Sequence, residues 1–268
     1  MSDYRVKAAY PFDLRQTLES GQAFRWRECD DGVFEGVAMD RFLKIRQQGD
    51  ELCFFDTSEK EYKEIWEDYF DLKRNYAAII KRANEDSRLI PMTALCKGIR
   101  ILKQPAFETL CSFIISQNNN IPRIKGIIER LCNNFGEPVN KGMAFPTAEK
   151  LAACNEDDLS VLRCGFRAKY IIDAAQKYIS VPSFKSIKGM SYNDAKGELM
   201  KIKGVGPKVA DCTLLFGFGF LEAFPIDVWM KRAMEQYFPD GLSPDLSDCA
   251  GVIQQYIFHY TRSISLKK

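Results

Sequence analysis

The fold is decided by the stretch Leu199-Met-Lys-Ile-Lys-Gly-Val-Gly-Pro-Lys-Val-Ala-Asp-Cys212. Its apolar residues before position 203 are typical of the end of a helix, and Pro207 suits the first turn of another. Gly204 and Gly206 allow positive φ and a close approach of the backbone to a ligand. Free N–H groups at such a turn and helix start can hold one phosphate. The stretch therefore predicts a helix–hairpin–helix that grips a nucleic-acid backbone.

Two polar residues near this hairpin are candidates for chemistry. Lys208 lies just inside the second predicted helix, and Asp227 follows Phe224-Pro-Ile further along the chain. Taken alone, Lys208 could be a solvated surface lysine, and Asp227 could cap the helix predicted at 228–237. For Asp227 a capping role and a catalytic role do not exclude each other.

Length, composition and charge set broad limits. A chain of 268 residues is long for one core, so two or three packed domains are expected. Hydrophobic residues make up 46%, as in globular proteins, and no apolar run is long enough to cross a membrane. The N-terminus has no apolar signal region, which argues against secretion. A net charge of +2 does not predict nucleic-acid binding, but basic residues recur beside the motifs.

The nine cysteines are widely spaced and include no C-x-x-C pair. This spacing argues against an iron–sulfur cluster or a zinc ribbon, and His259 is the single histidine. No cofactor and no catalytic metal are therefore expected. An odd count without an export signal indicates reduced thiols, mostly buried as small hydrophobic residues.

Periodicity predicts an α+β protein that is mostly α. Alternation at 33–38 and 42–46, followed by a turn into 52–55, indicates an antiparallel sheet. Helical spacing follows over 59–82, and from Ile90 onward the pattern is nearly all helical. The later helices are expected at 107–115, 124–135, 147–154, 156–164, 167–179, 193–200, 207–216, 228–237 and 245–260.

Five further sequence blocks accompany the hairpin and span nearly the whole chain. They are Ser20-Gly-Gln-Ala-Phe-Arg-Trp-Arg27, Gly98-Ile-Arg-Ile-Leu-Lys-Gln104, Ser112-Phe-Ile-Ile-Ser-Gln-Asn-Asn-Asn-Ile-Pro-Arg123, Gly165-Phe-Arg-Ala-Lys-Tyr170 and Ala250-Gly-Val-Ile-Gln254. In this order they resemble the 8-oxoguanine DNA glycosylases of the eukaryotic type, within the helix–hairpin–helix (HhH-GPD) DNA glycosylase superfamily.

The resemblance implies a small antiparallel β-rich domain at 1–85, like half of a TBP fold, and a two-part all-helical body at 86–268. Within that body, 119–220 would form the central part with the hairpin. The segments 86–118 and 221–268 would pack against it and form the cleft.

The resemblance also implies a base-excision-repair glycosylase with AP lyase activity. Lys208 would attack C1′ of the sugar as a neutral amine, a form that a helix N-terminus and partial burial favour. Attack would release the flipped base and leave an imine, and loss of a proton from C2′ would then eliminate the 3′ phosphate. Asp227 would stabilise the positive charge that develops on the sugar.

For the base pocket, the resemblance implies that the Gly21 carbonyl accepts a hydrogen bond from N7–H of 8-oxoguanine. Guanine has no proton there, so one acceptor can discriminate between the two bases. Gln254 would bind the Watson–Crick edge, and Phe258 and Cys212 would stack on opposite faces of the base. Without the family, Gly21 would be an ordinary turn glycine, and Gln254 and Phe258 would be helix packing.

For the duplex, the resemblance implies that Asn118 fills the space of the flipped base and Phe166 wedges beside the orphaned base. Arg123 and Arg167 would donate to an orphaned cytosine with the planar donor fork of the guanidinium. Without the family, these arginines would be phosphate contacts or surface charges.

Three positions depart from the family pattern. Phe166 stands where tyrosine is common, Ser160 where a further arginine aligns, and Trp229 where histidine is frequent. The first two bear on whether cytosine is required opposite the lesion, and the third on a phosphate contact. The hairpin could also hold a structural cation on the backbone carbonyls of Met200, Ile202 and Val205.

The expected partner is double-stranded DNA containing 8-oxoguanine, bound by a monomer, with no membrane association. The expected location is intracellular: cytoplasmic in a prokaryote, nuclear in a eukaryote. Two alternatives are an alkylpurine-type glycosylase without lyase activity and a non-catalytic DNA-binding module. Lys208 and Gly21 favour the 8-oxoguanine glycosylase/lyase over both.

Overall fold

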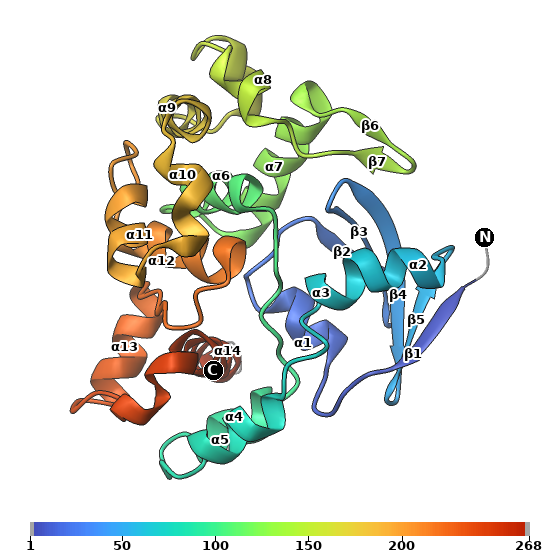
Figure 1. The fold of residues 1–268 in the computed structure, drawn as a ribbon, viewed down its shortest axis with the longest axis vertical. Coiled ribbons are helices and arrows are strands. Elements are labelled where there is room, and N and C mark those ends of the chain that lie inside the picture. The colour runs from blue at the N-terminus through green and yellow to red at the C-terminus, as the bar shows by residue number, and fades with distance from the viewer. Residues whose placement is uncertain (1–2, 266–268) are drawn as a thin grey trace.

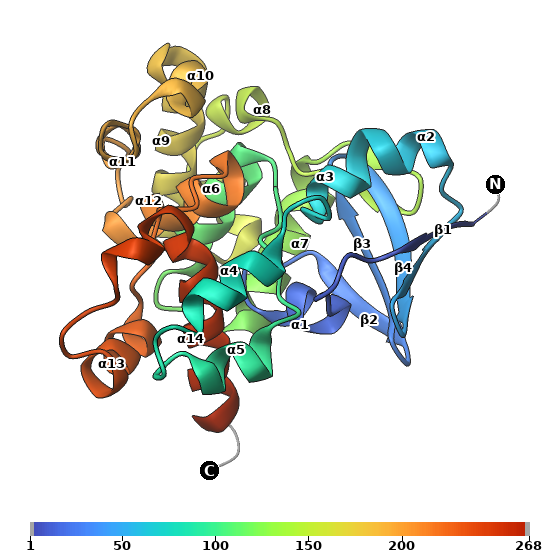
Figure 2. The same ribbon diagram turned by 60° about the horizontal axis from the view of Figure 1, so that its bottom comes forward.

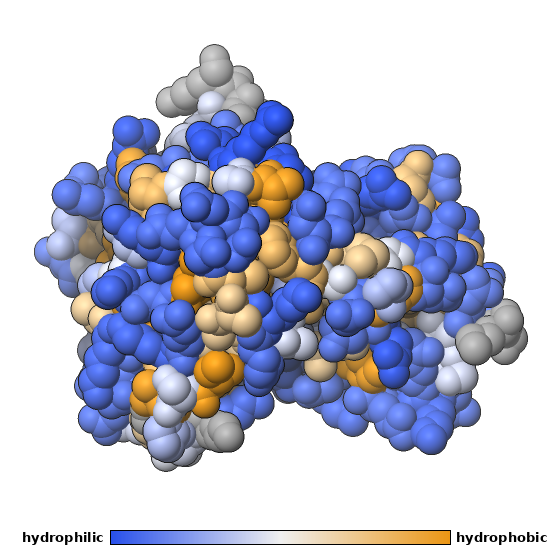
Figure 3. All heavy atoms as spheres, turned by 90° about the horizontal axis from the view of Figure 1, so that it is seen from above, coloured by the Kyte–Doolittle hydropathy of each residue, from blue (hydrophilic) through white to orange (hydrophobic). Residues whose placement is uncertain are grey.

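The structure, a computed structural model, describes residues 3–265. An antiparallel sheet forms one side of the molecule and helices form the rest (Figure 1). The chain is 53% helical, which confirms the predicted α+β, mostly α class. The face seen in Figure 3 is largely hydrophilic, with hydrophobic residues gathered near its middle.

The N-terminal part contains a five-stranded antiparallel sheet with the strand order β1-β5-β4-β3-β2. The strands are β1 (Tyr4–Lys7), β2 (Trp26–Asp30), β3 (Val33–Ala38), β4 (Arg41–Gln48) and β5 (Glu51–Phe55). The sequence predicts β3, β4 and β5 and misses the two edge strands. Four of the five residues of β2 are exposed, so this strand carries no alternation to detect.

Helices pack on this sheet, but the single helix predicted over 59–82 is wrong. Helix α1 (Leu14–Glu19) precedes β2, while α2 (Glu59–Glu61), a π-helical turn (Tyr62–Trp66) and α3 (Glu67–Tyr69) follow β5. The helix then stops because Asp71 adopts φ +49°, and Asn75 caps a new helix, α4 (Tyr76–Ala83), by accepting from the backbone N–H of Ala78.

The remaining elements form the helical body (Figures 1 and 2). They are α5 (Ile90–Cys96), α6 (Ala106–Ser116), α7 (Ile121–Phe135), β6 (Pro138–Val139), β7 (Gly142–Met143), α8 (Ala148–Ala152), α9 (Arg167–Ser180), α10 (Ser183–Ser186), α11 (Tyr192–Leu199), α12 (Pro207–Thr213), α13 (Val228–Tyr237) and α14 (Ala250–Ser265). Every helix predicted beyond residue 100 has a helical counterpart, but two are partly or wholly 3-10: Asp158–Leu162, and Pro244–Cys249 before α14. Helix α12 continues as a π-helical turn, Leu214–Phe218.

Two hydrophobic cores hold the chain together. The smaller lies under the sheet around Phe54, Trp66 and Phe70, and the larger fills the helical body. Each core takes residues from the far side of position 85: Leu102 packs in the smaller core, and Phe24, Tyr76, Ile79 and Ala83 pack in the larger. The two parts are therefore interlocked, and a domain boundary near residue 85 stays a prediction.

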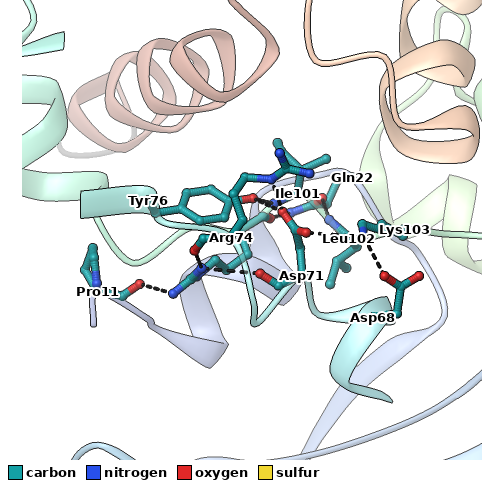
Figure 4. A network of polar contacts seen from close by, with 10 residues as sticks. Pro11, Gln22, Asp68, Asp71, Arg74, Tyr76, Ile101, Leu102 and Lys103 are labelled. Carbon is teal, nitrogen blue, oxygen red and sulfur yellow. Dashed lines mark hydrogen bonds and ion pairs between the residues drawn. The ribbon is translucent and has the colours of Figure 1, made fainter. Parts of the chain in front are cut away.

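An extended segment over 98–104 runs between the two cores. Four successive backbone N–H groups donate to four different parts of the molecule: Ile101 to the Tyr76 hydroxyl (2.8 Å), Leu102 to Gln22 Oε1 (2.8 Å), Lys103 to the Tyr69 carbonyl (2.9 Å) and Gln104 to the Phe216 carbonyl (2.8 Å). Figure 4 shows the Tyr76 and Gln22 contacts. The segment thus satisfies its backbone without joining a sheet.

Arg100 in this segment is fully buried. Its guanidinium donates to four backbone carbonyls: those of Ala9 (2.6 Å), Pro11 (2.9 Å), Asp71 (3.3 Å) and Arg74 (2.9 Å). Burial lowers the pKa of Arg100. Neighbouring Asp71 accepts from Tyr76 and Arg74, which closes the network (Figure 4).

The cysteines agree with the sequence analysis. All nine are free thiols, and seven of them are buried. Within residues 3–265, no helix has the length and apolar character needed to cross a bilayer.

Candidate active site

The predicted hairpin is present between α11 and α12. Gly204 in its turn has φ +78°, and a Cβ added there would lie 2.3 Å from Cδ2 of Tyr170. Only glycine fits this position. Gly206 differs from the prediction: its φ is −93°, and a Cβ there would meet nothing within 4 Å. It is the N-cap of α12, so the start of this helix is open to the outside.

A partly buried ion pair fixes the two hairpin helices to each other. Asp211 on α12 accepts from the Tyr192 hydroxyl (2.6 Å) and from Lys196 Nζ (2.9 Å), both on α11. Burial alone would lower the pKa of Lys196, but its hydrogen bonds to Asp211 and Tyr192 raise it. Sequence analysis missed this pair, although an aspartate inside the apolar run 209–213 is a usable signal.

Lys208 projects from the first turn of α12 and is half-buried. Its Nζ lies 3.3 Å from Ser116 Oγ, at the end of α6, and 4.8 Å from the centre of the Phe113 ring. In the described part of the chain it makes no ion pair. The amine therefore has a hydroxyl, an aromatic face and the Cys212 thiol as its partners, and no carboxylate of the described residues forms an ion pair with it.

Asp227 is the N-cap of α13. Its Oδ1 accepts from the backbone N–H of Met230 at 2.8 Å, as the capping interpretation predicts. Within residues 3–265, Oδ2 has no hydrogen-bond partner. One oxygen thus orients the carboxylate, which belongs to the lining of the recess described next.

All six residues predicted for catalysis and base binding line one recess. Its empty volume is about 320 Å³, and it is lined by Gly21, Lys208, Cys212, Asp227, Gln254 and Phe258, with Phe113, Phe216, Pro225 and Gln255. These residues come from the Gly21 loop, α6, α12 and its π-helical turn, the segment before α13, and α14. The structure thus brings together residues that are up to 237 positions apart, from Gly21 to Phe258.

The Gly21 loop is held by its buried neighbours. Gly21 has φ +81°, and a Cβ added there would lie 3.5 Å from Phe258 Cε1. Next to it, the Gln22 amide donates to the Arg100 carbonyl (2.7 Å) and accepts from Leu102 N–H (2.8 Å; Figure 4). These bonds fix the loop against the extended segment 98–104.

Gln254 is buried on α14 and already oriented. Its Nε2 donates to the Pro225 carbonyl (3.0 Å), and its Oε1 accepts from Gln255 Nε2 (2.9 Å). The Oε1 of Gln255 is buried without a partner in residues 3–265. Sequence analysis missed Gln255 as a pocket residue, because a second glutamine on a packed helix carries no distinguishing signal.

Two aromatic rings complete the recess. Phe113 and Phe216 stack with centroids 5.5 Å apart and planes inclined by 20°. Cys212 lies in the same wall, where burial raises the pKa of its thiol to about 11 although the charge of Lys208 opposes this. The wall facing Lys208 is therefore apolar and its sulfur is protonated near neutral pH.

The three asparagines before α7 have separate roles. Asn118 is exposed with φ +48°, Asn119 donates to the Ile115 carbonyl (3.1 Å), and Asn120 caps α7 by accepting from Arg123 N–H (3.0 Å). Asn118 thus stands out from a loop that its neighbours hold in place.

Phe166 and Arg167 lie beside this loop at the start of α9. Phe166 is 50% exposed, and the Arg167 guanidinium lies 4.6 Å from its ring centre. Arg167 is buried and donates to the carbonyls of Cys164 (3.1 Å) and Gln117 (3.1 Å). Burial lowers the pKa of Arg167 most, and the positive charge of Arg123 lowers it further. In this structure the donors of Arg167 serve the loop, so its contact with an orphaned base stays a prediction.

Arg123 is exposed, and its side chain makes no hydrogen bond or ion pair in the part of the chain that the structure describes. It is therefore the freer of the two arginines. The other departures are placed as follows: Ser160 lies in a 3-10 turn, and Trp229 lies on α13 with Arg232 5.7 Å from its ring centre.

The cation predicted at the hairpin also stays a prediction. The Ile202 carbonyl accepts from the Val205 N–H at 3.1 Å, which fixes the turn. Elsewhere in residues 3–265, no group of three histidine, cysteine, aspartate or glutamate side chains converges in a way that could hold a metal ion.

Two family models match the chain. The N-terminal domain of 8-oxoguanine DNA glycosylase matches residues 5–110, and the HhH-GPD superfamily of base excision DNA repair proteins matches residues 111–245. The chain therefore belongs to the HhH-GPD superfamily of base excision DNA repair proteins, in the branch that carries the 8-oxoguanine glycosylase N-terminal domain.

Individual relatives agree. A probable N-glycosylase/DNA lyase of Methanothermobacter thermautotrophicus is 30% identical, over 95% of each chain. The N-glycosylase/DNA lyase of Saccharomyces cerevisiae is 42% identical over 51% of this chain and 41% of its own length.

Solved structures give the same result. MBOgg1 in complex with a low-affinity DNA ligand is 40% identical with a TM-score of 0.93, over 99% of this chain and 97% of that one. The 8-oxoguanine glycosylase/lyase of Clostridium acetobutylicum, in complex with double-stranded DNA containing cytosine opposite 8-oxoguanine, is 35% identical with a TM-score of 0.90, over 99% of both chains.

Proposed function

We propose that this protein is a bifunctional DNA glycosylase that removes 8-oxoguanine from duplex DNA and cleaves the resulting abasic site by β-elimination. The observation that carries the proposal is that the Lys208 amine and the Asp227 carboxylate line one recess together with Gly21. Family membership supports it, as do relatives named glycosylase/lyases, one of them in complex with 8-oxoguanine DNA.

Lys208 is the proposed nucleophile. Its neutral Nζ attacks C1′, the C1′–N9 bond breaks, and the base leaves with the bonding electron pair. Opening of the sugar ring gives an imine between Nζ and C1′. Loss of a proton from C2′ then lets the 3′ phosphate depart, and water releases the lysine. Its neighbours in the structure are the Ser116 hydroxyl and the Phe113 ring.

Asp227 is the proposed electrostatic partner. Positive charge develops on the sugar as the base departs, and a carboxylate oriented before the reaction stabilises it without reorganisation. The cap bond to Met230 supplies that orientation.

Gly21 is the proposed base discriminator. Its loop is fixed by Gln22, so its carbonyl cannot turn away from guanine, which presents a lone pair at N7. Gln254 is proposed to bind the Watson–Crick edge, with Phe258 and Cys212 on the two faces of the base.

The duplex is proposed to lie across the hairpin and the Asn118 loop. Backbone N–H groups at Gly204 and Gly206 and at the start of α12 would hold one phosphate, and Val205 would lie against the same DNA strand between them. Asn118 would fill the vacated space and Phe166 would wedge beside it. Arg123 and Arg167 would contact cytosine, and the replacement of the family's tyrosine and arginine by Phe166 and Ser160 leaves this preference to experiment.

An enzyme of this kind works where the cell keeps its DNA. We therefore propose an intracellular location, in the cytoplasm of a prokaryote or the nucleus of a eukaryote, and action as a monomer.

Borohydride trapping tests the proposal. Duplexes with one 8-oxoguanine opposite each of the four bases are incubated with the protein, with Lys208→Gln, and with Lys203→Gln as a matched hairpin control. We expect a covalent adduct that Lys208→Gln abolishes and Lys203→Gln retains. Base release without an adduct would favour an alkylpurine-type glycosylase, and duplex binding without base release would favour a non-catalytic module.

A further inference from the structure

A second recess lies behind the Gly21 loop, between α7 and α14. Gly21 lines both recesses, so its loop forms the wall between them. The second recess has an empty volume of about 840 Å³ and is lined by Glu19, Ile121, Lys125, His259 and Arg262 among others. None of the proposed catalytic or base-binding roles uses these five residues. We call it the basic recess.

Arg262 is the main unpaired charge of the basic recess. It lies on α14 one turn beyond Phe258, so the same helix face serves the base pocket and the recess. It is half-buried, and in residues 3–265 it has no hydrogen bond or ion pair. A half-buried guanidinium without a partner in the protein keeps its five N–H donors for water or for a ligand.

Lys125 supplies a second cation. Its Nζ donates to the Trp26 carbonyl at 2.8 Å, which leaves two of its three N–H donors for another partner. His259 is half-buried beside Arg262 and has no hydrogen bond in the described residues. The one acidic side chain of the lining, Glu19, lies 3.9 Å from Arg15 Nη1, and its charge also acts on Lys125. The recess therefore has an excess of unsatisfied donors and positive charge.

The position of the basic recess indicates its ligand. Ile121 is the first residue of α7, directly after the asparagine loop that is proposed to enter the duplex. Gly21, on the other side, touches the flipped base in the proposed complex. A DNA strand that passes from the duplex to the base pocket thus runs beside the recess, and its phosphates are the anions nearest to it.

We propose that the basic recess binds a phosphodiester group of the strand that carries the flipped base, with Arg262 as the principal donor and Lys125 as the second. A guanidinium fork matches the geometry of phosphate oxygens. The proposal rests on the proposed function, because it requires that a duplex binds with one base flipped into the pocket.

The test is duplex binding at several salt concentrations. A duplex with a stable abasic-site analogue is titrated with the protein, Arg262→Ala, Arg262→Lys and a control, Arg5→Ala, on the edge strand β1 far from α14 (Figure 1). Losing one phosphate contact lowers the slope of log K against log salt by about 1. We expect Arg262→Ala alone to show this lower slope, together with a lower affinity that does not depend on the orphaned base. Arg262→Lys should keep most of the slope.

Unfolding midpoints of all variants are measured alongside, and Lys125→Met replaces Arg262→Ala if the latter does not fold. An unchanged slope in a folded variant overturns the proposal. A second result would also overturn it: inorganic phosphate, added at constant ionic strength, stabilises the protein in an Arg262-dependent way, whereas the salt slope of DNA binding does not depend on Arg262. The ligand of the recess would then be free phosphate. Base release by the unaltered protein is scored separately, so a failed recess and a failed glycosylase assignment give different results.

Discussion

The Tyr192 hydroxyl donates to the Asp211 carboxylate at 2.6 Å, which joins the two helices of the hairpin below its turn. Lys196 completes the pair at 2.9 Å. Replacing Asp211 with alanine leaves the partly buried Lys196 without its carboxylate, so we expect a loss of up to roughly 3–5 kcal/mol in the free energy of unfolding. Tyr192→Phe removes one hydrogen bond to a charged group and should cost about 1.5–3 kcal/mol. Urea unfolding measures both, and equal losses would contradict this ranking.

The same pair gives a pH dependence. The pKa of Lys196 is higher in the folded chain than its ordinary value of 10.5. The contribution of the ion pair to the stability of the fold is therefore complete below pH 10.5. It is lost as the pH rises through the raised pKa of the folded state. Between pH 9 and 12, the free energy of unfolding should therefore decrease less steeply with pH for Lys196→Met than for the unaltered protein. Denaturant unfolding at a series of pH values measures this.

Asp227 has two roles that two substitutions can separate. Asparagine caps a helix about as well as aspartate, whereas alanine loses about 1 kcal/mol of stability. Asp227→Asn should thus unfold like the unaltered protein but release base at a rate lower by roughly 10²-fold or more, because the charge is gone. Asp227→Ala should show both losses. A stable, fully active asparagine variant would leave only the capping role.

The two hairpin glycines should respond differently to alanine. Gly204→Ala places a Cβ against the Tyr170 ring and requires φ +78°, so a loss well above the roughly 1–2 kcal/mol of the backbone strain alone is expected. Gly206→Ala meets nothing within the protein, and its cost should stay near 1 kcal/mol or below. Its main effect should be weaker duplex binding, measured by titration, because the new methyl group stands where the phosphate backbone is proposed to approach.

Cys212 should be an unreactive thiol. Since its pKa is raised to about 11, the thiolate that reacts with iodoacetamide forms only in strongly alkaline solution. At pH 8 the exposed Cys29 should be alkylated first, as mass spectrometry of peptides would show. Lys208→Gln should slow labelling of Cys212 further, because the lysine charge opposes the rise in pKa.

Sequence patterns predicted the helical body well because its helices carry both periodicity and caps. The helix at Val228–Tyr237 was predicted to the residue from Asp227 and the apolar spacing behind it. The helix over 59–82 failed because its break at Asp71 has no proline or glycine to mark it and is held in part by the distant Arg100, which donates to the Asp71 carbonyl. Local pattern alone cannot show such partners.

Sequence patterns placed the recess only in outline. The hairpin motif and the resemblance identified the residues that line it, and the structure brings them together. The Phe113–Phe216 stack, Gln255 and the Asp211 pair escaped notice, since apolar and polar residues inside a helix look alike whether they pack, line a cavity or pair across elements.

The extended segment over 98–104 has a mechanical consequence. Its successive N–H groups are bonded to Tyr76, Gln22, Tyr69 and Phe216, and rotation of the sheet against the helical body would break several of these bonds together. The junction between the sheet and the helical body is therefore rigid and does not act as a hinge. We therefore expect the protein to meet DNA as a rigid template, so that the work of bending and opening the duplex falls on the DNA, and damaged sites that deform easily are selected before any base is read.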